Sequence, residues 1–394
     1  MKTKMNVLVS AIALAFSCSA LAAEPVAYET ESGVNIIPVI ATGYKYDDNI
    51  FSQGKDTQSS GIFTLAPAVS FLVGDGVNTF QVDFGVESGT FIDSEDDDYV
   101  TGNLGYKGHF EASSSARFDL NVGVNLGVEP RGTGITEGTG DAVDEPVTYE
   151  EQEAELNYEY GSASSKASIA LDGRFYSKSY TNFQEFTRVR SFDASSLTGT
   201  FFYSTNSRTD AFVELKSETI GYDANGLVSR DSDVFSALVG VKWEATALTS
   251  GSIKVGQQEK SFDNAMREDF SGVSWDALVQ WQPLTYTTLS FNTSRNAKDP
   301  NVVGDYINES LYGVNWVHQW DEKISTTLGF NFTNEDYSGI TREDETTMLT
   351  ANVAYEIRRW VDMSLYINTT NKESTNDAIV FDKSIVGLNF TFSL

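Results

Sequence analysis

The chain ends in a segment where large apolar residues alternate strictly with small or polar ones. The apolar positions are Val386, Leu388, Phe390, Phe392 and Leu394, and the positions between them hold Gly387, Asn389, Thr391 and Ser393. A period of two is the spacing of a β-strand whose two faces meet different surroundings. The end of the chain is therefore predicted to be a strand with one apolar and one polar face.

The same alternation recurs along the chain from residue 35 onward. In one run, Phe118, Leu120 and Val122 alternate with Asp119 and Asn121. The links between the runs alternate in length. Short links are expected at 73–78, 112–115, 161–165, 205–208, 245–249, 282–284, 320–323 and 358–360. Long links are expected at 47–60, 93–99, 129–147, 180–187, 222–233, 262–270, 296–305, 334–345 and 371–378.

This pattern predicts an all-β fold, a transmembrane antiparallel β-barrel. The apolar side of such a wall faces lipid, the other side faces a wet lumen, and short turns and long loops occupy opposite rims. Residues 35–394 are expected to form the barrel, with about 18 strands or, as the alternative count, about 16. The short turns would face the periplasm and the long acidic loops the cell exterior. A water-soluble β-sandwich is the alternative fold that the alternation allows.

The N-terminus is typical of an export signal. Lys2 and Lys4 supply positive charge, residues 7–16 form a short apolar core, and Ala20 and Ala22 give the small-residue cleavage pattern. A signal peptide is expected at 1–22, followed by a short periplasmic segment at 23–34. The single cysteine, Cys18, falls inside the signal peptide. The mature chain is then expected to have neither a disulfide nor a cysteine metal site.

The charge of the chain argues against nucleic acid as a partner. The formal net charge is -29 at pH 7, and such a chain repels phosphates. Much of the acid lies in the expected long links, as in the run from Asp96 to Asp98. An acidic exterior suits a cell surface where divalent cations bridge lipopolysaccharide, but a solvated, solubilising face is the simpler explanation. The run lacks the glycine and the later glutamate of a calcium loop, so no metal site is predicted.

Tryptophans gather beside the expected short links. Trp281, Trp316, Trp320 and Trp360 all lie next to one. Aromatic rings with one wet and one apolar side settle at a membrane interface. The sequence therefore predicts an aromatic girdle at the short-turn rim.

The residues that carry most enzyme chemistry are nearly absent. The chain has two histidines, His109 and His318, and both lie near expected short links. A girdle or lumen role is expected for both, because neither can reach the opposite rim, where barrel enzymes need a histidine beside a serine or aspartate. No nucleotide motif or Cys/His metal spacing is present. The sequence predicts a protein that is not an enzyme and needs no cofactor.

The polar phase of the strands predicts a charged lumen. Mixed charge at these positions can form ladders of ion pairs around a wet or plugged pore. By strand phase, the pore-lining positions are Asp83, Glu87, Lys107, Arg117, Asp119, Glu153, Glu155, Lys166, Asp172, Arg174, Glu214, Lys216, Lys254 and Asp276. The longest link, 129–147, is expected to fold into the lumen, with a disordered surface loop as the alternative.

The first barrel segment carries a family resemblance. It reads GYKYDDNIF and is followed by a strand with an internal proline, FTLAPAVSFLVG. This order resembles the outer-membrane β-barrel proteins encoded in exopolysaccharide and capsule operons and described as porins. The correspondence falls on Tyr46, Asp48, Asn49 and Pro67. Asp48 and Asn49 are expected to cap backbone amides where the strand becomes a loop, and Pro67 to mark a bulge or a weakened pairing.

The resemblance implies a role in polysaccharide export. The function predicted from it is a passive outer-membrane channel or scaffold for exopolysaccharide or capsular polysaccharide. One alternative is a general or solute-specific diffusion porin, and another is a plugged barrel that acts as a surface receptor or adhesin. The expected partners are outer-membrane lipid and lipopolysaccharide, the barrel-assembly machinery through the C-terminal strand, and polysaccharide with periplasmic export proteins.

Overall fold

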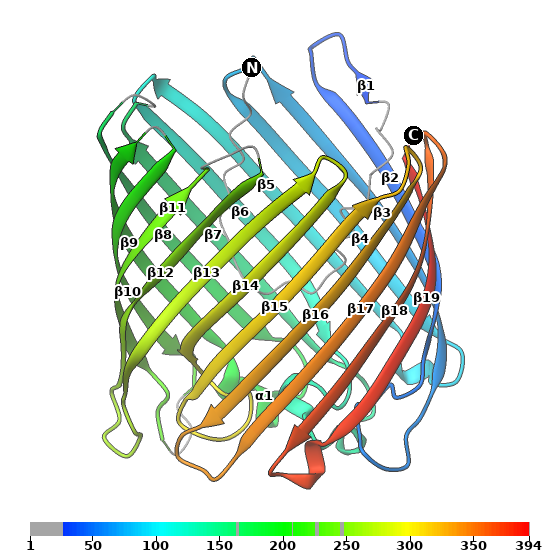
Figure 1. Ribbon diagram of the computed structural model, residues 1–394. Coiled ribbons are helices and arrows are strands. Elements are labelled where there is room, and N and C mark those ends of the chain that lie inside the picture. The colour runs from blue at the N-terminus through cyan, green and yellow to red at the C-terminus, as the bar shows by residue number, and fades with distance from the viewer. Residues whose placement is uncertain (1–26, 163–164, 207, 225–227, 245–247, 394) are drawn as a thin grey trace.

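The chain forms one antiparallel sheet that closes on itself (Figure 1). The computed structural model describes residues 27–162, 165–206, 208–224, 228–244 and 248–393. The expected signal peptide and Leu394 lie outside them. The strands are β1 (Tyr28–Glu29), β2 (Asn35–Asp47), β3 (Ser60–Gly74), β4 (Thr79–Phe91), β5 (Tyr99–Ser113), β6 (Ala116–Glu129), β7 (Val147–Tyr160), β8 (Ala167–Tyr180), β9 (Phe192–Asn206), β10 (Thr209–Tyr222), β11 (Ser232–Trp243), β12 (Thr249–Phe262), β13 (Phe270–Leu284), β14 (Thr287–Lys298), β15 (Ile307–Gln319), β16 (Ile324–Tyr337), β17 (Glu343–Arg358), β18 (Val361–Ser374) and β19 (Phe381–Ser393).

The barrel closes where its last strand meets its first long one. Each strand from β2 to β19 pairs with the next, and β19 pairs with β2 from Ile385↔Asp47 to Ser393↔Val39. The short β1 pairs only with the start of β2, through Tyr28↔Ile36 and Glu29↔Asn35. The wall is therefore the predicted 18-stranded barrel, with β1 as an extra strand. A single closed sheet also excludes the sandwich of two packed sheets.

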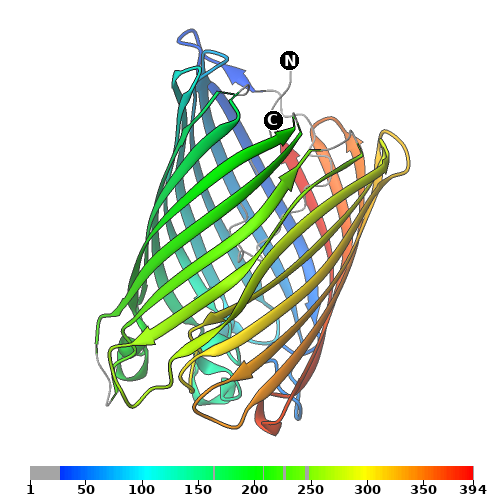
Figure 2. The same ribbon diagram turned by 60° about the vertical axis from the view of Figure 1, so that its left-hand side comes forward.

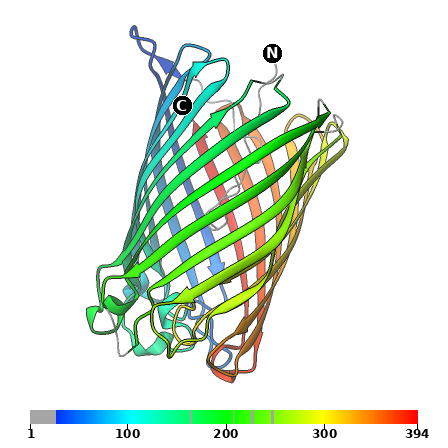
Figure 3. The same ribbon diagram turned by 90° about the vertical axis from the view of Figure 1, so that its left-hand side faces the viewer.

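Short turns and long loops occupy opposite rims, as predicted. In Figure 1 the short turns share the upper rim with β1, and the long loops share the lower rim with α1; Figures 2 and 3 show the same division from other sides. The link between β13 and β14 is displaced, because β13 continues to Leu284. The helical segments of the long-loop rim are η1 (Glu95–Asp97), η2 (Gly134–Thr136), η3 (Gly140–Ala142), α1 (Gln184–Thr187), η4 (Arg188–Arg190) and η5 (Asp377–Ile379).

None of the helices in the described residues has the length and hydropathy that a membrane-spanning helix needs.

The outer wall is apolar and open to its surroundings. Leu197 is 62% exposed and Phe63 is 56% exposed, although both lie within strands. Many other large apolar side chains of the outer wall are exposed in the same way, and a continuous apolar surface of this kind marks a contact with membrane lipid or with another protein. Trp281, Trp320 and Trp360 are also exposed and lie at the short-turn rim, which is the place predicted for the aromatic girdle.

Candidate functional site

The lumen face of β4–β8 carries a ladder of charged contacts. Lys107 Nζ lies 3.9 Å from Asp83 Oδ2, and Arg117 Nη2 lies 2.5 Å from Glu159 Oε1. These pairs cross from one strand to the next because residues in register stand on the same face. Four further predicted residues join the ladder: Glu87 accepts from the Tyr99 hydroxyl at 2.8 Å, Asp119 contacts His109 Nδ1 at 2.6 Å, and Glu153 contacts Arg174 Nε at 2.5 Å.

Two predicted carboxylates lie on neighbouring strands. Glu155 on β7 is 8% exposed and accepts from Asn121 Nδ2 at 3.5 Å. Asp172 on β8 stands opposite Asn157 in the ladder, and its Oδ2 is buried without a hydrogen-bond partner among the described residues. The lumen therefore holds a carboxyl pair that cation neighbours do not fully neutralise.

The remaining predicted residues lie on β10, β12 and β13, with one exception. Lys254 Nζ lies 2.9 Å from Glu214 Oε1 and stands opposite Asp276 in the ladder, and Lys216 pairs with Glu218 on its own strand at 2.7 Å. The exception is Lys166, which the strand phase predicts on the lumen wall but which lies just before the strand. It lies in the turn before β8 and is exposed, because β8 begins at Ala167.

The two histidines face opposite sides of the wall. His109 lies on the lumen face, beside Asp119. His318 lies among rings, with centroid distances of 5.3 Å to Trp316, 4.3 Å to Trp320 and 5.4 Å to Tyr286. One histidine is thus in the lumen and the other in the aromatic girdle, the two roles that the sequence predicted.

The longest loop folds inward. We call residues 130–146, between β6 and β7, the first crossing loop. Glu137 at its centre forms an ion pair with Lys372 on β18 and lies 2.8 Å from Arg342 in the loop before β17. Strands β19 and β2–β5 stand between β6 and β18 along the wall, so the loop extends over part of the lumen opening. The predicted inward fold of the 129–147 link is therefore present.

Buried ion pairs hold the first crossing loop at two points, near its start at Arg131 and near its centre at Glu137. Arg131 binds Asp97 through two nitrogens, at 2.7 and 2.5 Å, and its guanidinium lies 4.2 Å from the Phe51 ring centroid. The hydrogen bonds that Arg131 donates to Asp97 raise the pKa of Arg131. Burial opposes the charge on Arg342, but the hydrogen bonds that Arg342 donates to Asp344 and Glu137 outweigh it and raise the pKa of Arg342. Both arginines therefore act as permanently charged anchors.

One glycine allows the close approach of the first crossing loop to its neighbour. Gly132 has a φ of +79°, and a Cβ built there would lie 1.7 Å from the carbonyl oxygen of Phe51. A residue with a side chain would therefore strain the backbone and push the two loops apart.

A second loop, which the sequence does not predict to fold inward, extends from the side of the barrel opposite the first crossing loop. We call residues 299–306, between β14 and β15, the second crossing loop. Its carbonyls accept from Arg190 and, at 2.5 Å, from Arg230, and its Asp305 accepts from Arg267 at 3.1 Å. Arg190 lies in the link that follows β8, and the second crossing loop begins after β14. Strands β9–β13 therefore stand between Arg190 and that loop along the wall. The available signal in the sequence is that Arg230 and Arg267 lie in two separate long links and that Arg190 closely follows a third.

The two crossing loops meet at the loop between β16 and β17. Arg342 of that loop donates to Glu137 in the first, and the Ser338 carbonyl accepts from the Asp305 amide in the second at 2.9 Å. Figures 1 and 2 show coiled segments at this rim within the outline of the barrel. A polar lumen whose long-loop opening is crossed by two ion-paired loops is the candidate functional site.

The motif behind the family resemblance serves barrel closure. Asn49 is 1% exposed, and its amide nitrogen donates to the carbonyls of Gln53 and Asp382, both at 2.8 Å. Asp48 accepts from the Ser384 amide at 2.7 Å. These bonds continue the β2–β19 pairing past its last rung, so the capping role predicted for the two residues is present. Tyr46 lies on the outer wall, 46% exposed.

Pro67 interrupts a ladder without shifting it. On β3, the pairing with β4 runs from Ile62 to Leu65 and resumes at Ala68 in the same register. Proline has no amide hydrogen to donate, so the rung is lost. Of the two outcomes predicted for Pro67, the weakened pairing is the one observed.

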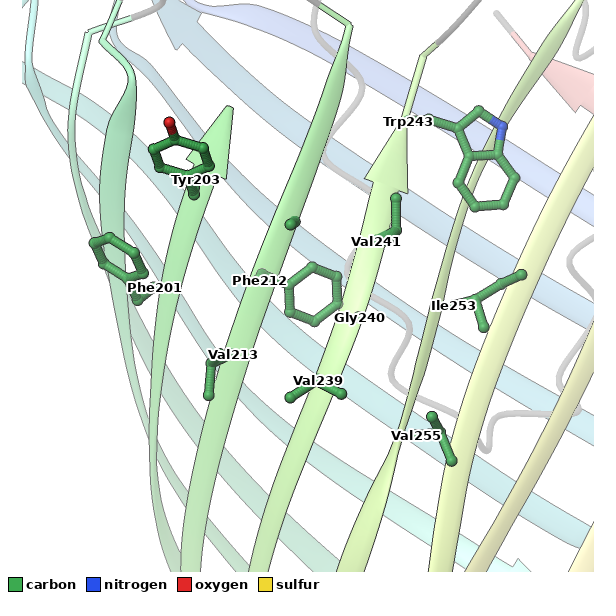
Figure 4. A pocket seen from close by; sticks show the side chains of 11 residues that line it. Phe201, Tyr203, Phe212, Val213, Val239, Gly240, Val241, Trp243, Ile253 and Val255 are labelled. Carbon is green, nitrogen blue, oxygen red and sulfur yellow. The ribbon is translucent and has the colours of Figure 1, made fainter. Parts of the chain in front are cut away.

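A large hollow lies on the outside of the wall. It has a volume of about 600 Å³ over β9–β12 and is lined by side chains such as Phe201, Val239 and Ile253 (Figure 4). Its lining is almost entirely apolar, and all three of these residues are more than 40% exposed. This hollow is an apolar surface feature and is separate from the lumen.

Closed antiparallel barrels with a polar lumen and inward loops are the architecture of porins. The chain matches the family model described as "Putative beta-barrel porin 2" over residues 35–394 and belongs to that family. No curated protein matches the chain in sequence. Among solved structures it is similar to OpdQ of Pseudomonas aeruginosa, with TM-score 0.51, 12% identity, and coverage of 93% of this chain and 99% of that one.

Two further structures share the fold. OpdK of Pseudomonas aeruginosa has TM-score 0.51 and 10% identity, with coverage of 92% and 99% of the two chains. A BenF-like porin of Pseudomonas fluorescens Pf-5 has TM-score 0.50 and 10% identity, with coverage of 91% and 99%. At this identity the likeness establishes the fold alone.

Proposed function

We propose that the protein is an outer-membrane diffusion porin for small solutes. The short turns face the periplasm and the crossing loops face the cell exterior. The observation that carries the proposal is the charged lumen with its two crossing loops, in a chain of a porin family. Solutes pass down their gradient through the polar lumen, and no covalent chemistry is involved.

The crossing loops favour small solutes over polymers. An extended sugar chain must pass the mouth, where Glu137 and Arg342 are held by buried ion pairs. Neither the family model nor the similar structures point to polysaccharide export, so the porin alternative replaces it here. The proposed partners are lipopolysaccharide at the apolar wall and the assembly machinery at β19.

The proposal is tested by solute entry into vesicles. The purified protein is reconstituted into liposomes, and swelling is followed in isosmotic arabinose, sucrose and raffinose, with protein-free liposomes as control. The porin account predicts swelling that falls steeply with solute size. No swelling in any of the three sugars would contradict it.

A plugged receptor is the second candidate, because the same ion pairs also suit a closed mouth. A variant that lacks residues 132–143 separates the two. If the wild-type protein is closed and only the shortened variant admits arabinose, the barrel is a plugged receptor rather than a porin.

A further inference from the structure

A cavity lies where the second crossing loop meets the loops that it reaches. Its volume is about 420 Å³, and its lining includes Arg190, Arg230 and Arg267 together with Val302, Val303 and Ile340. The arginines come from three separate loops, and barrel closure brings them together. The cavity thus combines guanidinium groups with an aliphatic wall.

Two of the guanidiniums keep donors that no atom of the described residues accepts from. Arg230 is 7% exposed and donates through Nη2 to the Pro300 carbonyl, while its Nε is buried without a partner. Arg190 donates through Nη2 to the Val302 carbonyl, and its Nη1 is buried without a partner. A buried donor on a charged group costs free energy when it has no acceptor. The free donors of Arg190 and Arg230 are therefore placed to bind an acceptor that is not part of the described protein.

The nearby carboxylates do not supply that acceptor. Asp305 is taken by Arg267 at 3.1 Å, and Asp299 lies 3.0 Å from Lys260. Within the described residues, no carboxylate lies in ion-pair distance of Arg190 or Arg230. Burial lowers the pKa of Arg190, and the attraction of Asp299 offsets this only in part. An added anion would complete this compensation.

We propose that this cavity binds a small organic anion whose oxyanion group contacts Arg190 and Arg230 and whose apolar body lies against Val302, Val303 and Ile340. A planar carboxylate or a phosphate group accepts well from guanidinium nitrogens. The aliphatic lining favours a hydrocarbon body over a sugar. This inference deepens the proposed porin function by naming a solute class, and it rests on that function only for the passage of the solute.

Binding is measured directly, without transport. Hexanoate, hexyl phosphate and the neutral hexanamide are titrated into the detergent-solubilised full-length protein by calorimetry. The proposal predicts saturable binding of at least one anion and none of hexanamide. The two anions together decide whether a carboxylate or a phosphate group is preferred. Equal binding of the anions and hexanamide would overturn the proposal, as would the absence of any binding.

Variants locate the site. Arg230→Gln is expected to weaken anion binding about tenfold, because a charge-assisted hydrogen bond is lost. The matched control is Arg359→Gln, which makes the same change at an exposed position in the short turn between β17 and β18; it should bind like the wild type. If Arg230→Gln fails to fold, Ile340→Trp, which fills the cavity without removing a charge, should weaken binding instead. Unchanged affinity in the folded site variants would overturn the assignment.

The binding result and the porin result are independent. Liposomes closed to all sugars would end the porin proposal, whereas calorimetry would still decide the anion site. Conversely, an open porin that binds no anion would retain its function and lose this inference.

Discussion

At the scale of single residues, Asn49 shows how a short motif determines barrel closure. Its side chain uses three hydrogen bonds, two donated and one accepted from the Gln53 amide at 3.1 Å. One of them reaches Asp382, which lies 333 residues away in sequence. The motif is local in sequence, but its partner is set by closure, so the sequence predicted a cap and could not identify the strand being capped.

Asn49→Ala is expected to destabilise the barrel by about 2 kcal/mol or more, because buried backbone groups lose their partners. The free energy of unfolding is measured by urea titration in phospholipid vesicles. Asn301→Ala removes an exposed asparagine and should change it little. Equal stability of the two variants would show that the motif does not hold the β2–β19 pairing.

Asp75 in the first short turn predicts a pH dependence. Hydrogen bonds from Asn78 and Val77 lower its pKa from 3.8 to about 2. A depressed folded-state pKa means that the carboxylate stabilises the turn above pH 3.8, and that this contribution is lost as the pH falls to about 2. The difference in thermal midpoint between wild type and Asp75→Ala should be constant from neutral pH to about pH 5 and then vanish. A difference that grew on acidification would contradict this.

At the scale of elements, strands were far more predictable than loop contacts. The alternation of apolar and polar residues sets which face each side chain occupies, so residues such as Asp83 and Glu214 could be placed on the lumen face from phase alone. Phase fails at strand ends, as Lys166 shows.

Contacts between loops have no such periodic signal. Arg190 and Val302 are 112 residues apart, and only the closed wall brings their loops together. The length of the first crossing loop could therefore predict its inward fold, whereas the arginines in and beside other long links do not identify the second crossing loop as their partner.

The first crossing loop should loosen when its central ion pairs are removed. Glu137→Gln takes one carboxylate from both Lys372 and Arg342, and backbone hydrogen exchange across residues 130–146 should rise about tenfold. The matched control is Glu145→Gln, which makes the same change at an exposed site in the same loop. Exchange that rises equally in both variants, or in neither, would show that Glu137 does not fix the loop.

At the scale of the whole molecule, the wall has an apolar outside and a polar inside, which inverts the arrangement of a soluble protein. The composition is unremarkable, with 40% hydrophobic residues, because half of each strand faces the lumen. Only the strict alternation distinguishes this wall from a soluble sheet.

The two faces should respond differently to the same charge. Leu197→Arg, near the middle of β9 on the outer wall, should destabilise the barrel in vesicles by about 2–4 kcal/mol, because an arginine then faces hydrocarbon. Thr198→Arg, on the adjacent lumen position, should cost much less. Equal destabilisation in urea titrations would contradict the assignment of the outer face to lipid.

The central claim is that the lumen connects the two sides of a membrane. Single-channel recording of the wild-type protein in a planar lipid bilayer tests it most directly. The account predicts discrete, reproducible current steps, and larger steps after removal of residues 132–143 from the first crossing loop. A bilayer that stays electrically silent with both proteins, although each is inserted and folded, would contradict it.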